Sequence, residues 1–381
     1  MRIGVTATLI TALTSALAAA PPAAAGSSTI TDLGTLPGDT SSTVSGLNQA
    51  GVVIGTSFAR DASSVIIRER AVKWSADGVI TALPLPANGT NPRSRPAGVN
   101  DSGVIAGSSY GGQAERALRW NTDNTVTVLD PLPGDTSSRA TAVTADGTVV
   151  GHSLGPGRPT RAVRWSPGTT ITQLPIPAGY TDSTGRAAND SNVVAGSTSG
   201  PNVPGRVLRW HPDGTSTDIS AHVVIPYIIN NSGAIAGWGN SSRGVRLDPD
   251  GSTVDLGSYA EPAAINATGA IAGNIGNIPY RHAARWAPDG TVSTLPSLPN
   301  DPYSLASDIN DEGVTVGASS VLRSPFAMEN HAVHWAASGA VTSLGFLPGG
   351  KASQAVFVNN AGTVAGWSDS AAGIRAVRWR L

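Results

Sequence analysis

The feature that most constrains this chain is an internal repeat built from two motifs. The first motif is Asn-x-x-Gly-x-x-x-Gly, and its eight copies, two of them imperfect, begin at residues 48, 100, 144, 189, 230, 266, 310 and 359. The second is a basic residue or His, two small or aliphatic residues, another basic residue or His, and Trp, beginning at residues 70, 116, 161, 206, 243, 282, 331 and 375. Leu247 replaces the Trp in the fifth copy. The copies begin roughly 36 to 52 residues apart. Repeats of this length indicate a supersecondary unit that buries its core only by stacking on its neighbours.

Each repeat is interpreted as four short strands, which we name A to D. Asn followed by Gly three residues later suits the first and last positions of a type I turn, so the first motif predicts a tight hairpin between strands A and B. The Trp motif forms strand C, and a second tight turn, such as 75–78, leads into strand D. Four strands per repeat are typical of one blade of a β-propeller.

The two ends of the chain predict how the repeats close into a ring. The last repeat stops at strand C and has no strand D, whereas residues 27–38 resemble the strand D and exit loop at 339–349. We therefore predict an all-β, eight-bladed β-propeller of four-stranded blades, closed by an N-terminal strand that completes the last blade. The alternative, an open solenoid, would leave this N-terminal strand unpaired.

The connections between strands divide into a constant set and a variable set. The A–B and C–D turns keep their length, whereas the B–C segment runs from Gly55 to Trp74 in the first repeat and only from Gly237 to Leu247 in the fifth. All Tyr residues lie in or beside the B–C and D–A segments. Because the A–B and C–D turns share one face of a propeller, the opposite face carries the variable, aromatic loops and is the expected binding face.

We predict a notch on this variable face at the fifth repeat, where the loops are shortest. Its candidate ligand-binding residues are Trp238, Tyr227, Tyr259 and Glu261, with Trp367 as a further candidate at the same repeat position in the eighth repeat. Aromatic rings beside a few polar groups suit stacking on sugars or anchoring of a peptide. Two structural alternatives stay open: Trp238 fills the space left by the missing Trp at Leu247, and Trp367 is a packing residue.

Other repeated residues are interpreted as structural. The Trp residues of strand C are expected to wedge between blades, each over the Gly that ends strand B. The basic residues of strand C are expected to donate hydrogen bonds to carbonyl groups of adjoining blades. His331 and His334 are three residues apart on a strand and point to opposite faces, so they predict no metal site, and no cofactor is predicted.

Catalytic chemistry finds little support in the residues. Most Asp residues lie at turn positions, where the side chain bonds the local backbone. The few Glu residues are Glu69, Glu115, Glu261, Glu312 and Glu329. No catalytic residue is predicted, although a polysaccharide hydrolase or lyase acting at the central channel stays open as an alternative. That alternative requires a cluster of carboxylates at the channel mouth.

Composition and the N-terminus predict an exported protein. A net charge of −1, 13 % charged residues, 45 Gly and 27 Pro describe a turn-rich globular chain with no polyelectrolyte partner, which argues against nucleic acid. Residues 1–25 carry one Arg, an apolar stretch and a final Ala run, the layout of a secretory signal peptide. We expect residues 26–381 to form a single propeller domain, monomeric and without a membrane span. The absence of Cys is compatible with export and excludes disulfides.

The combination of "LGTLPGDTSS" at 33, "GLNQAGVVIG" at 46 and "HAVHW" at 331 resembles the HAF-repeat family of bacterial extracellular repeat proteins. The resemblance covers nearly the whole mature chain, but most copies here begin with Arg and none has Phe in third place, as in a divergent member. It implies export and a repeat-built fold, and it brings no catalytic residue or ligand. The resulting hypothesis is a secreted, non-enzymatic protein that binds an extracellular glycan or protein through its variable face, with a purely structural surface repeat as another alternative.

Overall fold

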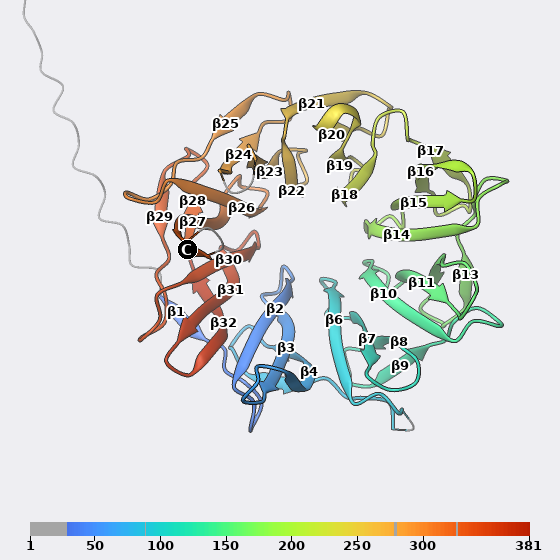
Figure 1. The fold of residues 1–381 in the computed structure, drawn as a ribbon, viewed down its shortest axis with the longest axis horizontal. Coiled ribbons are helices and arrows are strands. Elements are labelled where there is room, and N and C mark those ends of the chain that lie inside the picture. The colour runs from blue at the N-terminus through green and yellow to red at the C-terminus, as the bar shows by residue number, and fades with distance from the viewer. Residues whose placement is uncertain (1–28, 88, 278–279, 325–326) are drawn as a thin grey trace, which may run out of the picture.

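The computed structural model describes residues 29–87, 89–277, 280–324 and 327–381, so the predicted signal peptide lies outside the described residues. The described chain forms eight four-stranded antiparallel sheets arranged in a ring (Figure 1). One short 3-10 turn, η1 (Asn240–Ser242), interrupts the strands. The predicted eight-bladed β-propeller is therefore the observed fold.

Each blade runs from the innermost strand A to the outermost strand D. Blades 1 to 4 are formed by β2 (Ser41–Leu47), β3 (Val53–Arg60), β4 (Ile66–Trp74), β5 (Ile80–Ala82); β6 (Arg93–Val99), β7 (Ile105–Tyr110), β8 (Arg116–Trp120), β9 (Val126–Leu129); β10 (Ser137–Val143), β11 (Val149–Leu154), β12 (Arg161–Trp165), β13 (Ile171–Gln173); and β14 (Asp182–Ala188), β15 (Val194–Gly200), β16 (Val203–Trp210), β17 (Ser216–Asp218). Blades 5 to 8 are formed by β18 (Ile225–Ile229), β19 (Ile235–Trp238), β20 (Arg243–Leu247), β21 (Thr253–Ser258); β22 (Glu261–Ile265), β23 (Ile271–Ile275), β24 (His282–Trp286), β25 (Val292–Thr294); β26 (Tyr303–Ile309), β27 (Thr315–Ser324), β28 (Ala327–Trp335), β29 (Val341–Ser343); and β30 (Ser353–Val358), β31 (Thr363–Ser370), β32 (Gly373–Arg380), β1 (Ile30–Asp32).

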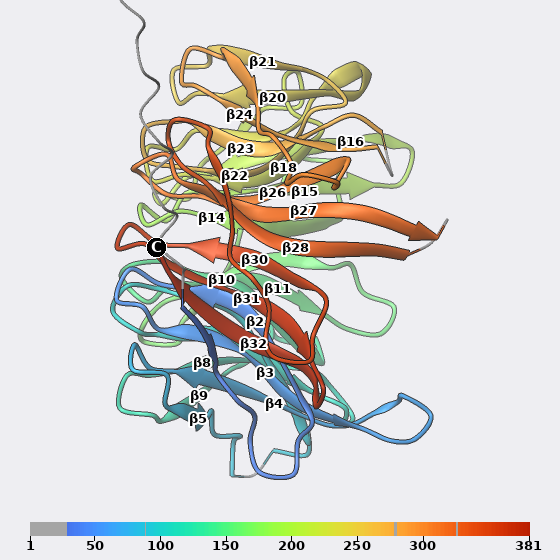
Figure 2. The same ribbon diagram turned by 90° about the vertical axis from the view of Figure 1, so that its left-hand side faces the viewer.

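The first strand of the chain completes the last blade. β1 pairs antiparallel with β32, and Ile30 lies opposite Trp379 in the register. The first and last segments of the described chain therefore lie side by side, as both ribbon views show (Figures 1 and 2). This pairing confirms the predicted closure and excludes the open solenoid.

A β-bulge in strand A explains the second Gly of the first motif. In blade 1 the register between β2 and β3 shifts between Val44 and Gly46. A Cβ atom at Gly55 would lie only 1.9 Å from the carbonyl oxygen of Thr43, so the bulged strand leaves no room for a side chain. Gly55 is the third residue of β3, which corrects the expectation that this Gly ends strand B.

The Trp residues of strand C wedge between blades, as predicted. Trp120 is buried in a cluster with Ile54, Ala71 and Leu83 of the preceding blade. Its ring covers Gly107, where Cζ3 would lie 2.8 Å from an added Cβ. In most blades the indole N–H also donates to a carbonyl in or just beyond strand D of the preceding blade: Trp120 to Pro84, Trp165 to Asp130, Trp210 to Pro175, Trp286 to Leu256 and Trp335 to Pro296, at 2.6–2.9 Å.

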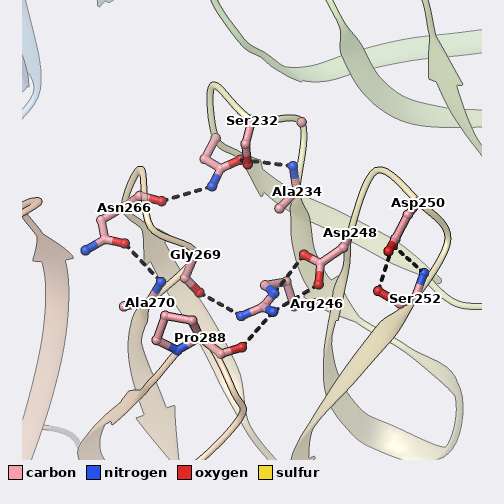
Figure 3. A network of polar contacts seen from close by, with 12 residues as sticks. Ser232, Ala234, Arg246, Asp248, Asp250, Ser252, Asn266, Gly269, Ala270 and Pro288 are labelled. Carbon is pink, nitrogen blue, oxygen red and sulfur yellow. Dashed lines mark hydrogen bonds and ion pairs between the residues drawn. The ribbon is translucent and has the colours of Figure 1, made fainter.

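The Asn residues of the first motif, each directly after strand A of its blade, link the blades into a hydrogen-bonded ring. Each Oδ1 accepts from the turn of its own blade, as Asn266 does from Ala270 at 2.9 Å, while each Nδ2 donates to the backbone of the next blade. Figure 3 shows the bond from Ala270 to the Asn266 side chain and the bond that the Asn266 carbonyl accepts from blade 5. The donor–acceptor pairs are Asn48–Asn100, Asn100–Thr144, Asn189–Asn230, Asn230–Asn266, Asn266–Asn310, Asn310–Asn359 and Asn359–Asn48. At Thr144 the side-chain hydroxyl instead donates to Asn192 at 2.8 Å.

Basic side chains of strand C form a second set of links on the same face. Arg246 donates to the carbonyl oxygens of Gly269 and Pro288 in blade 6, both at 2.8 Å, and is held by Asp248 (Figure 3). Arg119, Arg164, Arg209, Arg285 and Arg378 bond carbonyl groups of the following blade in the same way. The predicted use of these basic residues as inter-blade donors is confirmed.

Candidate functional site

The two faces of the ring differ in how regular they are. The A–B and C–D turns, with the Asn and Arg links, lie on one face, which we call the constant face. The B–C and D–A connections lie on the other, the variable face, where the long β27–β28 hairpin projects from the disc (Figure 2). Blade 5 lies at the opposite extreme, because only Gly239 and η1 connect β19 to β20.

Three of the predicted site residues line one cavity beside blade 5. The cavity has a volume of about 320 Å³ and is lined by Trp238, Tyr259, Glu261, Gly276, Asn277 and Arg281. Trp238 ends β19, Glu261 begins β22, and Arg281 precedes β24, so the cavity opens on the variable face between blades 5 and 6. We call it the blade 5–6 cavity.

An ion pair and a tyrosine supply the polar part of the site. The Arg281 guanidinium lies 2.7 Å from the Glu261 carboxylate and bridges β22 to the B–C loop of blade 6. Tyr227, at the bulge of β18, is half-buried, and this burial raises the pKa of its hydroxyl, with a further contribution from the negative charge of Glu261. Tyr227 therefore interacts electrostatically with Glu261, although it is not among the residues that line the cavity.

Tyr259 is held in a conformation that bulky residues seldom adopt. Its φ is +55°, in the left-handed region, and its side chain is 50 % exposed. Ser241 and Ser242 in the facing loop also have positive φ, at 59° and 57°. The N–H of Tyr259 donates to the carbonyl oxygen of Ser242 at 2.9 Å. The strain of these residues is concentrated where the short loop meets the cavity, a pattern that is common at binding sites.

Trp238 does not substitute for the missing Trp of blade 5. Leu247 packs toward blade 4, in a cluster with Ala195 and Val207, whereas Trp238 lines the cavity toward blade 6. The two side chains therefore lie on opposite faces of the blade 5 sheet, which excludes the first structural alternative. The indole N–H of Trp238 is buried and has no hydrogen-bond partner among the described residues.

Trp367 lies apart from the other predicted site residues. It occupies the same repeat position on β31 of blade 8, opposite Gln354 and Ala376 in the register, and is half-buried. It does not line the blade 5–6 cavity. The structure thus brings together Trp238, Tyr259 and Glu261, places Tyr227 nearby, and separates Trp367 from them.

Sequence reasoning missed two further cavities on the variable face. One, of about 560 Å³, lies between blades 4 and 5 and contains Thr184, Ser197, Arg206, Val224 and Asn240. The other, of about 300 Å³, lies between blades 2 and 3 and contains Arg95, Ser108, Tyr110, Glu115 and Arg139. One repeat position could have indicated all three cavities, namely the residue after the second Gly of the first motif. Ser108, Ser197 and Trp238 occupy this position, and each lines one of the cavities.

The glutamates on the variable face are paired with arginines. Arg95 lies 2.5 Å from Glu69, and Arg139 lies 2.8 Å from Glu115, which repeats the pairing of Arg281 with Glu261.

Elsewhere, burial raises the pKa of Asp308 on β26 to about 7, although its carboxylate accepts hydrogen bonds from the N–H groups of Val358 and Ile309. Among the described residues, no three His, Asp or Glu side chains gather in a way that would hold a metal ion. The described part of the chain also contains no helix that is long and apolar enough to cross a membrane.

Comparisons with known proteins show similarity in fold. No family model and no curated protein sequence matches the chain. Among solved structures, Porphyromonas gingivalis dipeptidyl peptidase 4 is similar with a TM-score of 0.58 and 12 % identity, over 89 % of this chain and 59 % of that one. Staphylococcus aureus virginiamycin B lyase (TM-score 0.43, 12 % identity, 93 % and 99 % covered) and the β-propeller domain of the Pyrococcus furiosus Trilobed protease (0.45, 9 %, 90 % and 94 %) are more distant. At such identities the likeness shows a propeller architecture alone.

Proposed function

We propose that this protein is a secreted, non-enzymatic repeat protein that binds an extracellular glycan in the blade 5–6 cavity. The observation that carries the proposal is the convergence of Trp238, the half-exposed Tyr259 and the Glu261–Arg281 ion pair on one concave site of the variable face. Secretion rests on the signal-like residues 1–25.

The chemistry of the cavity suits a sugar ring. Aromatic side chains offer flat apolar faces on which the C–H face of a pyranose can stack. Glu261 supplies acceptor oxygens and Arg281 supplies N–H donors, a combination that complements neighbouring hydroxyl groups. A volume of about 320 Å³ is at the lower end of the range for small-molecule sites.

The non-enzymatic part of the proposal follows from the acidic groups. Glycoside hydrolysis requires two carboxyl groups that flank the scissile bond, one as acid and one as base or nucleophile. The described lining of the blade 5–6 cavity contains one carboxylate, Glu261, and it is paired with Arg281. The cavity therefore supports binding better than hydrolysis.

The proposal is tested by a glycan-array screen of the mature protein beside the variants Tyr259→Ala and Glu261→Gln. We expect selective binding that falls at least tenfold in both variants, because each loses one contact with the ligand. Trp367→Ala and Phe346→Ala are matched controls, since both remove aromatic rings on or near the variable face in blade 8 and outside this cavity. Unfolding midpoints of all variants must stay near the wild-type value.

Two results would overturn the proposal. Binding that is lost equally in the Trp367→Ala and Phe346→Ala controls would show that the contacts lie elsewhere on the ring. Absence of binding to every glycan would leave a protein partner or a structural role as the function.

A further inference from the structure

The cavity between blades 4 and 5, of about 560 Å³, has a structural cause. In most blades a buried Ser of strand A accepts a hydrogen bond from strand C of the preceding blade and closes this end of the crevice. These pairs are Ser42–Ala376, Ser94–Ala71, Ser138–Ala117, Ser183–Ala162, Ser304–Ala283 and Ser353–Ala332. In blade 5 the equivalent residue is Val224, which is 47 % exposed, and Ser220 from the incoming loop takes over the bond to Val207. The crevice therefore stays open as the blade 4–5 cavity.

Hydroxyl and amide side chains supply most of the polar residues in the lining of the blade 4–5 cavity, beside Val207, Val223 and Val224. Ser197 and Thr184 hydrogen-bond each other across the sheet at 3.1 Å. Asn240, exposed in η1, forms the rim on the blade 5 side. These groups both donate and accept hydrogen bonds, which is the requirement for recognising hydroxyls on a ligand.

The two cavities that flank blade 5 are separated only by the ends of two paired strands. The N–H of Val224, in the blade 4–5 cavity, donates to the carbonyl oxygen of Trp238, in the blade 5–6 cavity, at 2.6 Å. The loop above this pair is the shortened connection that contains Asn240. No longer B–C loop of blade 5 stands between the two cavities, so one extended molecule can cross from one to the other.

The arginines of both cavities are paired with carboxylates. Glu261 is paired with Arg281 in one cavity, and Arg206 is paired with Asp218 beside the other. Arg206 also donates to the Tyr180 hydroxyl at 2.6 Å. The other charged residue of the blade 4–5 lining, Asp182, accepts hydrogen bonds from the Thr160 N–H and the Thr181 hydroxyl and has no cationic partner among the described residues. Because the charge left without an opposite partner is negative, a neutral ligand is favoured over a polyanion.

We infer that the blade 5–6 and blade 4–5 cavities hold successive units of one neutral, linear oligosaccharide that crosses blade 5 over the η1 loop. This inference rests on the proposed function and extends it from a single sugar site to a chain-binding groove. Stacking in the blade 5–6 cavity anchors one unit, and the hydroxyl-lined blade 4–5 cavity binds the next units along the chain.

The test is calorimetric titration of the mature protein with neutral cello-, malto- and chito-oligosaccharides from disaccharide to octasaccharide. Oligogalacturonates of the same lengths serve as charged counterparts. We expect affinity for one neutral series to rise about tenfold or more once the chain is long enough to reach both cavities. The charged series should bind no better than the shortest neutral sugars.

Two variants locate the crossing point. Asn240→Ala should reduce the affinity for long chains to that for short ones while short-chain binding is unchanged. Insertion of Gly-Ser-Gly between Asn240 and Ser241, next to the Ser242 carbonyl that bonds Tyr259, should abolish the gain in affinity with chain length whatever its effect on short-chain binding. The matched control is the same insertion after Ser64, in the exposed B–C loop of blade 1, which should change neither. Tyr259→Ala should lower the affinity for every length.

The outcomes separate this inference from the proposed function. If short oligosaccharides bind and affinity does not grow with length, or if long chains bind the η1 insertion variant as well as wild type, the groove is wrong and the single site stands. If no oligosaccharide of any length binds, both proposals are overturned.

Discussion

The constant and variable faces are built from the same eight repeats and differ in what their side chains do. On the constant face, Asn266 and Arg246 are buried and donate to carbonyl groups of the next blade, and nearly every blade repeats the pattern. On the variable face, Trp238 and Tyr259 have no equivalents in most blades and present aromatic surface to a cavity. The comparison teaches that repetition here serves closure of the ring, while departures from the repeat mark the region available for binding.

The largest expected contrast is between two tryptophans. Trp120→Ala removes a fully buried wedge and its bond to Pro84, so we expect a loss of about 3–5 kcal/mol in the free energy of unfolding. Trp238→Ala removes a half-buried ring that lines an open cavity, so we expect less than about 2 kcal/mol. Urea denaturation of both variants measures the difference. Equal losses would show that Trp238 is a core residue and would break the distinction between the faces.

The next contrast concerns two asparagines. Asn266→Ala removes the donor to Asn310 and leaves the buried N–H of Ala270 without its acceptor, so we expect a loss of about 1–3 kcal/mol. Asn240→Ala, at the exposed rim of the blade 4–5 cavity, should change stability by less than about 0.5 kcal/mol. Thermal and urea unfolding of the two variants provide the comparison. A small effect at Asn266 would mean that the ring of Asn side chains is dispensable for closure.

The free energy of unfolding is expected to depend on pH through Asp308, whose side chain lies between the innermost strands of blades 7 and 8. Its folded-state pKa is about 7 against 3.8 for the unfolded chain, so between these values the folded protein keeps a proton that the unfolded chain has lost. The contribution of Asp308 to stability therefore falls as pH rises from about 4 to 7, by at most about 4 kcal/mol, and is level above pH 7. Asp308→Asn should flatten this decline. Parallel stability curves for variant and wild type would contradict the assignment.

The smallest expected effect tests whether the backbone at Tyr259, beside the cavity, is strained. Tyr259→Gly and Tyr259→Ala both remove the ring, but only Gly adopts a φ of +55° without steric cost. The Gly variant should therefore be more stable than the Ala variant by about 1 kcal/mol, and both should lose glycan binding. Denaturation midpoints and the glycan array measure the two quantities separately. An Ala variant as stable as the Gly variant would show that the backbone at residue 259 is not strained.

The fold was predictable because its information is repeated in the chain. Eight copies of two motifs specify the number of blades, the wedge tryptophans and the turns, and the resemblance of residues 27–38 to a strand D predicts the pairing of β1 with β32. The bulge opposite Gly55 was not predicted, because it depends on the close approach of two strands and leaves no mark on the alternation of residues.

The site was predictable only in part. Shortened loops at the fifth repeat indicate where the variable face is hollowed, and Trp238, Tyr259 and Glu261 do lie together. The face toward which Trp238 points depends on parity, because neighbouring residues on a strand point to opposite sides. The blade 4–5 cavity results from replacing one buried Ser by Val224, and the role of that Ser becomes visible only through its partner in the preceding blade.

The pairing of β1 with β32 has a consequence for the order of folding. Ala376 in β32 bonds Ser42 in the first blade across a separation of 334 residues, and the backbone of Leu33 bonds that of Ala376. Contacts this distant in sequence are costly in loop-closure entropy and form late. Each internal blade can assemble from neighbouring segments as the chain emerges, yet the eighth blade lacks a strand until both termini have met. Assembly of this molecule therefore ends with a single docking event, in which β1 pairs with β32 and completes the eighth blade.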